Sequence, residues 1–96
     1  MDMKYDLQEF IDAPTIQSIN NSLIERVRAR RKEQGLTQRQ LADRSGVSYA
    51  SLRRFETMGE ISLTSLLRLA KALGCIEDFN ALFKRKTITD LKGFEG

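Results

Sequence analysis

The sequence predicts an all-α fold of five short helices. Three observations lead to this prediction. Apolar side chains recur at the three- and four-residue spacing of one helix face, residues that cap helices precede these runs, and glycines follow them. Alternating patterns typical of strands are nearly absent. A chain of 96 residues is long enough for one small core, so we expect a single helical domain.

The first helix is expected to end at Gly35, because a glycine after an apolar run commonly stops a helix. Pro14 and Thr15 offer one start, since proline is tolerated in a first turn and threonine caps helices. Residues 20–22 offer a second start of the same kind, and both remain open. The apolar stripe of this helix consists of Ile16, Ile19, Leu23, Ile24 and Val27.

A second helix is expected over residues 38–44. Thr37 and Gln40 have the spacing of a capping box, in which each residue bonds the backbone N–H of the other. Leu41 and Ala42 then form the inward face of a helix only two turns long.

A third helix is expected to begin after Ser48, which can cap it, and to run to about Glu56. Leu52 and Phe55 form its inward face. Gly46 lies in the connection from the second helix, where a tight turn favours a residue that tolerates positive φ.

A fourth helix is expected from Ser62, a capping residue, to Gly74. Its predicted core stripe consists of Leu63, Leu66, Leu67, Ala70 and Leu73. A fifth, shorter segment covers residues 77–83. We therefore expect a helical domain over residues 15–83, with an N-terminal arm at 1–14 and a tail at 84–96, both flexible.

Composition excludes most catalytic chemistry. The chain has no histidine and one cysteine, which argues against a zinc site, a Cys/His nucleophile pair and a disulfide framework. No paired carboxylates or glycine-rich phosphate loop are recognisable, so we expect neither an enzyme nor a bound cofactor. No apolar run has the length of a membrane span, and the acidic start is unlike a signal peptide. These features predict a cytoplasmic protein with a reduced thiol.

Charge is concentrated in the middle of the sequence. Residues 22–56 carry nine basic and four acidic side chains, a net charge of +5, whereas residues 1–21 have a net charge of −3 and residues 57–96 of +1. A basic segment between less basic flanks favours an anionic partner, and the phosphate backbone of nucleic acid is the commonest one. A solvated basic helix face is the alternative.

The second and third helices together meet the requirements of a helix-turn-helix. Two short helices that cross at a steep angle need a small residue at their contact, here Ala42, and a turn residue that tolerates positive φ, here Gly46. The apolar anchors on the inner faces are Leu41, Val47, Leu52 and Phe55. This combination predicts a DNA-binding unit.

The string LTQRQLADRSGVSYASLRRFE, preceded by RVRARRKEQG and followed by LTSLLRLAKALG, resembles the λ-repressor-like or Xre family of DNA-binding domains. The resemblance covers about residues 23–83. It implies that Thr37 and Gln38, at the head of the second helix, bind a phosphate of double-stranded DNA. It also implies that the start of the third helix reads bases in the major groove.

The expected DNA contacts follow from matching this sequence to the family pattern. Arg53 and Arg54 are the strongest candidates for guanine or phosphate, and the sequence leaves open which of them reads a base. Many family members have Gln at the first exposed positions of this helix, where this sequence has Tyr49 and Ala50, so a glutamine contact to adenine cannot be assumed. Ser45 stands where an apolar residue is more common. The full expected set is Thr37, Gln38, Arg39, Ser48, Tyr49, Ala50, Ser51, Arg53 and Arg54.

The resemblance also implies an ion pair between Arg31 and Glu56. The residue pattern agrees, because Arg31 lies one turn after Val27, at the edge of the buried stripe, and Glu56 follows the inward Phe55. Both side chains would be partly desolvated, where a charge needs a partner.

A narrower resemblance concerns the FETMGEISLTSLLRLAKALG string, with an expected loop at residues 57–60. It is similar to HipB-like antitoxins, which regulate operons together with HipA-like kinases. The functions considered are an operator-binding repressor that forms a homodimer, either as such an antitoxin or as a phage-type repressor without a toxin, and a protein that neutralises a partner enzyme with DNA binding secondary. The expected dimer surface is Ile76, Phe79, Leu82 and Phe83.

Overall fold

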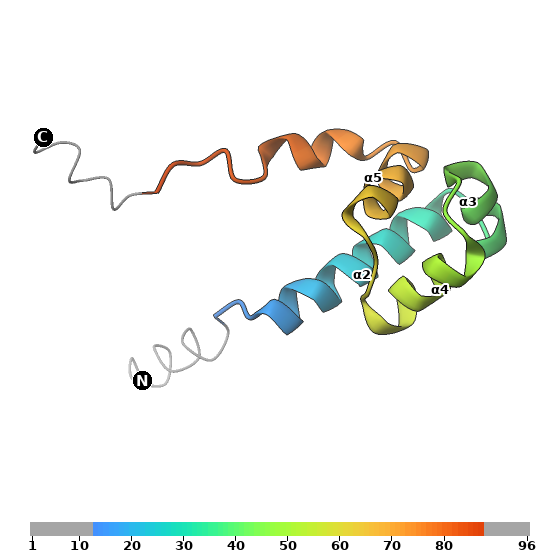
Figure 1. Ribbon diagram of the computed structural model, residues 1–96, viewed down its shortest axis with the longest axis horizontal. Coiled ribbons are helices and arrows are strands. Elements are labelled where there is room, and N and C mark those ends of the chain that lie inside the picture. Colours follow the sequence, from blue (N-terminus) through green and yellow to red (C-terminus); the bar gives the residue numbers. More distant parts are fainter. Residues whose placement is uncertain (1–12, 88–96) are drawn as a thin grey trace, which may run out of the picture.

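The computed structural model describes residues 13–87 and is all-helical over that range (Figure 1). Its elements are α2 (Ile16–Glu33), α3 (Gln38–Ser45), α4 (Tyr49–Met58), α5 (Leu63–Ala72) and the 3-10 helix η1 (Ile76–Ala81). The predicted all-α class is confirmed, and none of the described residues forms a strand. Most of the expected arm (1–14) and tail (84–96) lies outside the described residues.

Helix α2 begins at the earlier of the two expected starts. The Thr15 hydroxyl accepts a hydrogen bond from the Ser18 backbone N–H at 3.0 Å, and the Ser18 hydroxyl accepts one from the Thr15 N–H at 2.9 Å. This reciprocal capping box satisfies two backbone donors that the helix itself cannot satisfy. The helix ends at Glu33 with Gln34 as its C-cap, and Gly35 follows with φ 71°, as expected of a helix stop.

Only part of the apolar stripe on α2 is buried. Ile24 is 8% exposed, whereas Ile16 and Ile19 are 91% and 55% exposed. The first turns of α2 project beyond the other helices, so no element covers them (Figure 1). The periodicity gave the helix correctly, but burial requires a neighbour as well as a pattern.

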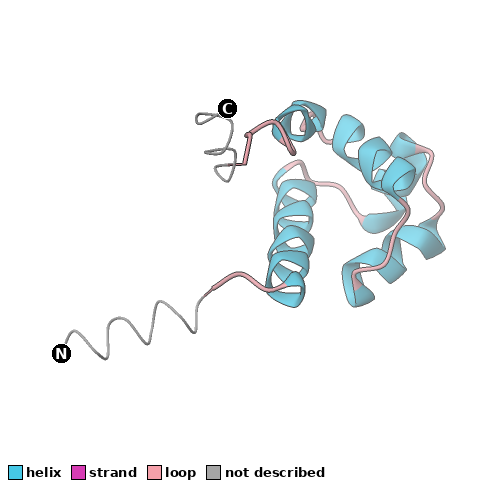
Figure 2. Ribbon diagram, turned by 60° about the vertical axis from the view of Figure 1, so that its left-hand side comes forward, coloured by secondary structure: helices cyan, strands magenta, loops and turns pink. Residues whose placement is uncertain are grey.

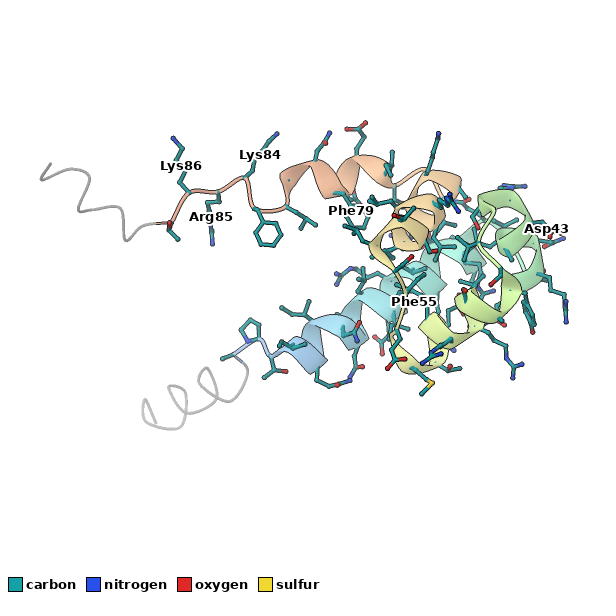
Figure 3. The ribbon with its side chains drawn as sticks, viewed as in Figure 1. Asp43, Phe55, Phe79, Lys84, Arg85 and Lys86 are labelled. Carbon is teal, nitrogen blue, oxygen red and sulfur yellow. The ribbon has the colours of Figure 1, made fainter. Side chains whose placement is uncertain are left out.

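The core lies where α2, α3, α4 and α5 meet, and short loops connect these helices (Figure 2). Its fully buried side chains are Leu41, Leu52, Phe55 and Leu69. Phe55 points inward from α4 to the middle of the bundle (Figure 3). Burial of a side chain of this size contributes about 1.5 to 3 kcal/mol.

The buried face of α5 differs from the predicted one. Leu69, outside the predicted stripe, is fully buried, whereas Leu63 is 64% exposed. Ala70 and Leu73 are buried as predicted, and Leu66 is partly buried. Leu69 shares one helix face with Leu66, Ala70 and Leu73, and α5 packs on α3.

Two element boundaries also differ. Helix α4 continues through Met58 and ends at Gly59, whose φ is 76°, so residues 57 and 58 belong to the helix and the expected loop at 57–60 is wrong. The segment expected over residues 77–83 is a 3-10 helix over Ile76–Ala81. No helix of the described residues is both long and apolar enough to cross a membrane.

Candidate nucleic-acid interface

The turn between α3 and α4 has the backbone that a helix-turn-helix needs. Gly46 adopts φ 80° and its N–H donates to the Ala42 carbonyl at 2.9 Å. The Ser45 hydroxyl accepts the Val47 N–H at 3.1 Å, which explains a polar residue at this position. Val47 is 3% exposed and anchors the turn in the core.

The N-terminus of α3 has free donors for an anion. Thr37 and Gln40 form the predicted capping box: the Thr37 hydroxyl accepts the Gln40 N–H at 3.1 Å, and the Gln40 side chain accepts the Thr37 N–H at 2.9 Å. Within the described residues, this leaves the N–H groups of Gln38 and Arg39 without a protein acceptor. Such donors, together with the helix dipole, suit a phosphate.

The outer face of α4 forms a shallow depression. Its lining residues are Tyr49, Ala50, Arg53, Arg54, Thr57 and Met58. Four of these belong to the expected DNA-contacting set. The Ser48 hydroxyl caps α4 by accepting the Ser51 N–H at 3.0 Å, and it donates to the Ser51 hydroxyl at 2.8 Å. Ser48 and Ser51 therefore serve first to begin the helix.

The heads of α3 and α4 are joined by a cation–π contact. The Arg39 guanidinium carbon lies 4.0 Å from the centre of the Tyr49 ring. Both residues were expected at the DNA, but the contact between them was not predicted. It depends on the crossing of two helices, for which their sequence spacing gives no signal.

The two arginines of α4 have different surroundings. Arg54 donates through Nε at 2.9 Å and through Nη2 at 2.6 Å to Glu60 Oε1. Arg53 is exposed and has no ion-pair partner among residues 13–87. Glu60 was not predicted as this partner, because it lies in the loop that follows α4.

The structure brings Arg31 and Glu56 together. Arg31 donates through Nε and Nη2 to the two Glu56 oxygens, each at 2.9 Å, and through Nη1 to the Leu36 carbonyl at 2.9 Å. Gln38 also donates to Glu56, at 2.8 Å, and Arg28 Nε lies 3.9 Å from the carboxylate. The link to Gln38 was not predicted, and it connects an expected phosphate contact to this buried network.

The residues expected at a dimer surface lie along η1 and directly after it, and η1 runs from the end of α5 away from α3 (Figure 1). Leu82 and Phe83 are 57% and 100% exposed, Ile76 is 37% exposed, and Phe79 is half-buried. Beyond them, Lys84, Arg85 and Lys86 extend along a segment that points away from α3 and α4 (Figure 3). This basic run therefore does not belong to the same face as the depression on α4.

A family model described as Helix-turn-helix matches residues 27–78, which contain α3, α4, α5 and the end of α2. Searches of curated proteins and of solved structures gave no match. The match covers more than half of the chain and includes both helices of the motif. The chain therefore belongs to the Xre and λ-repressor-like helix-turn-helix family and is a DNA-binding transcription regulator.

Proposed function

We propose that the protein is a sequence-specific repressor that binds its operator as a homodimer, with α4 in the major groove. The observation that carries this proposal is that two kinds of hydrogen-bond donor, backbone N–H groups and arginine side chains, are both exposed. The N-terminus of α3 offers backbone N–H groups, and α4 offers an outer face with Arg53 and Arg54. Phosphate contacts would position the domain, and α4 would read the bases.

Selection of bound duplexes from a random DNA pool tests this proposal. We expect one enriched sequence, and affinity for it that falls steeply with salt, because each neutralised phosphate contributes about −0.9 to the logarithmic slope. A pool that remains random after several rounds would overturn the proposal. Anisotropy measurements on the selected duplex then give the affinities.

The homodimer is proposed from the exposed apolar side chains at the end opposite α3. Ile16 and Ile19 on α2, and Leu82 and Phe83 after η1, lie on segments that both extend from this end (Figure 1). Exposed apolar side chains of this kind can form interaction surfaces, and a two-fold dimer uses the same surface on both copies. Sedimentation should give a dimer for the wild type and a monomer for Phe83→Asp. A monomeric wild type would contradict this part.

We further propose a HipB-like antitoxin role, with a HipA-like kinase as partner. It is supported by the resemblance of the sequence from Phe55 to Gly74 to such antitoxins. Co-expression with a kinase encoded next to this gene should give a stable complex on gel filtration and reduced kinase activity. A protein that binds its operator but no such kinase would instead be a repressor without a toxin.

A further inference from the structure

One acidic side chain lies on the surface proposed to face DNA, and it contacts an arginine there. Glu60 follows Gly59, the C-cap of α4, and its Oε1 accepts hydrogen bonds from Arg54 Nε and Nη2. Both side chains are exposed, at 58% for Glu60 and 62% for Arg54. A carboxylate near the phosphate backbone repels it and weakens DNA binding. General attraction to DNA therefore does not explain a glutamate at this position.

The backbone before Glu60 is fixed. The N–H of Gly59 donates to the Phe55 carbonyl at 2.8 Å, and the Gly59 carbonyl accepts from Asn20 Nδ2 at 3.3 Å. Gly59 lies so close to α2 that an added Cβ would be 2.5 Å from Asn20 Nδ2. Glu60 thus lies in a loop that hydrogen bonds of Gly59 hold to both α4 and α2.

The hydrogen bonds use only one edge of the Arg54 guanidinium. The Nε and Nη2 atoms form its side edge, which Glu60 occupies. The end edge, formed by Nη1 and the second hydrogen of Nη2, remains available. Two parallel donors on that edge are what the O6 and N7 atoms of a guanine accept.

The position of Arg54 on α4 also favours base contact. At 100° per residue, Arg54 and Ala50 project from the side of the helix opposite the centre of its three buried residues, Leu52, Phe55 and Glu56. Arg53 lies closer to the flank that carries Tyr49 and Glu56. Arg54 is therefore the arginine that α4 carries farthest from the core.

We propose that Glu60 is a specificity-determining positioning residue: it holds the Arg54 guanidinium so that its end edge reads guanine. This inference rests on the proposed function, because it concerns how the same face of α4 discriminates bases. The carboxylate raises base discrimination by restricting Arg54, and at the same time it weakens general attraction to DNA.

The test compares affinities for two duplexes, the selected sequence and the same sequence with the guanine pair replaced. Arg54→Ala should remove discrimination of about 5- to 150-fold at one base pair. Glu60→Ala should lower this discrimination by about three- to tenfold while binding to an unrelated duplex stays equal or becomes up to about threefold tighter. Glu60→Gln, which keeps the acceptor oxygen, should retain more discrimination than Glu60→Ala.

Glu33→Ala is the matched control, because Glu33 pairs with Arg30 at 2.6 Å on the exposed side of α2. It removes the same charge and should leave discrimination unchanged. The Arg54→Ala, Glu60→Ala double variant should discriminate no less than Arg54→Ala alone. The melting temperature of Glu60→Ala should fall by less than about 8 °C, since the pair is exposed.

Unchanged discrimination in Glu60→Ala, or an equal loss in Glu33→Ala, would overturn the role of Glu60. Loss of discrimination in Arg53→Ala but not in Arg54→Ala would show that the other arginine reads the base, and would overturn it as well. A wild type that prefers no duplex would instead refute the proposed function, and the two failures are therefore distinct.

Discussion

The protein contains two arginine–glutamate pairs of similar geometry in opposite surroundings. Arg31 and Glu56 have N···O distances of 2.9 Å with side chains 10% and 2% exposed. Arg54 and Glu60 have distances of 2.9 Å and 2.6 Å with side chains 62% and 58% exposed. The shorter contact belongs to the exposed pair, Arg54 and Glu60, whose hydrogen bonds water can replace. Distance alone therefore does not measure what a pair contributes to stability.

The difference arises from solvation. Water compensates either member of the exposed pair when its partner is removed, and such pairs contribute about 0 to 1 kcal/mol. The buried pair has no such compensation, but all its polar atoms are bonded: Leu36 and Gln38 complete the network. Among the described residues, no buried side-chain nitrogen or oxygen lacks a hydrogen-bond partner. The network of Arg31, Glu56 and Gln38 joins α2, α3 and α4. In the exposed pair, water can take the place of either partner.

The largest effect is expected from Arg31→Met. It leaves the Glu56 carboxylate buried without its main partner, and a broken buried pair lowers the free energy of unfolding by about 3 to 5 kcal/mol. Adding Glu56→Leu should recover part of that loss. Urea denaturation of the four proteins in this double-mutant cycle gives the coupling energy, and a value near zero would show that the pair is not energetically linked.

Operator binding should respond to Arg54→Ala, although folding should not. Loss of a bidentate base contact weakens specific binding by about 1 to 3 kcal/mol. The far-ultraviolet circular dichroism spectrum should be unchanged, because the side chain is exposed. Anisotropy with the selected duplex measures the effect, and an unchanged affinity would argue against contact by this residue.

Two glycines with the same backbone conformation but different neighbours allow a second comparison, in which no charged group takes part. Gly46 and Gly59 have φ of 80° and 76°, but an added Cβ meets nothing within 4 Å at Gly46 and lies 2.5 Å from Asn20 Nδ2 at Gly59. Gly46→Ala should cost about 1 kcal/mol from backbone strain alone, and Gly46→Val somewhat more. Gly59→Ala should cost about 1 kcal/mol beyond that, because Asn20 loses its hydrogen bond. Thermal unfolding tests the order, and equal losses would contradict it.

The smallest effect on folding is expected from Glu60→Gln. Removing the charge of the exposed pair should change the free energy of unfolding by at most about 1 kcal/mol. The change should shrink further at high salt, whereas that of Arg31→Met should persist. Urea denaturation at low and high salt separates the two pairs, and a salt-insensitive loss above this range would show that Glu60 has a structural role.

Features that depend on neighbouring residues in the sequence were predictable. The caps Thr37, Ser48 and Ser62 begin α3, α4 and α5 as expected, because a capping side chain bonds a backbone N–H three residues ahead. The helix-turn-helix anchors Leu41 and Leu52 are fully buried, as predicted. Local chemistry determines where each of these helices starts.

Features that depend on contacts between elements were not predictable in the same way. Leu69 was missed because two overlapping stripes of α5 have helical spacing, and the packing of α5 on α3 covers the one with Leu66, Leu69, Ala70 and Leu73. The contacts of Arg39 with Tyr49 and of Arg54 with Glu60 depend on how helices cross and how a loop returns. The pairing of Arg31 with Glu56 was expected mainly from the family resemblance.

The hydrogen bond from Gln38 to Glu56 links the start of α3 to α4. It ties the end of α3 that is suited to a phosphate to the body of the helix that is proposed to face the bases, so the two cannot slide independently. Successive base pairs are about 3.4 Å apart, and a slip of α4 by that length would present its side chains to the neighbouring pair. On the proposed function, the phosphate bound at the start of α3 would therefore also set which base pair lies opposite each side chain of α4.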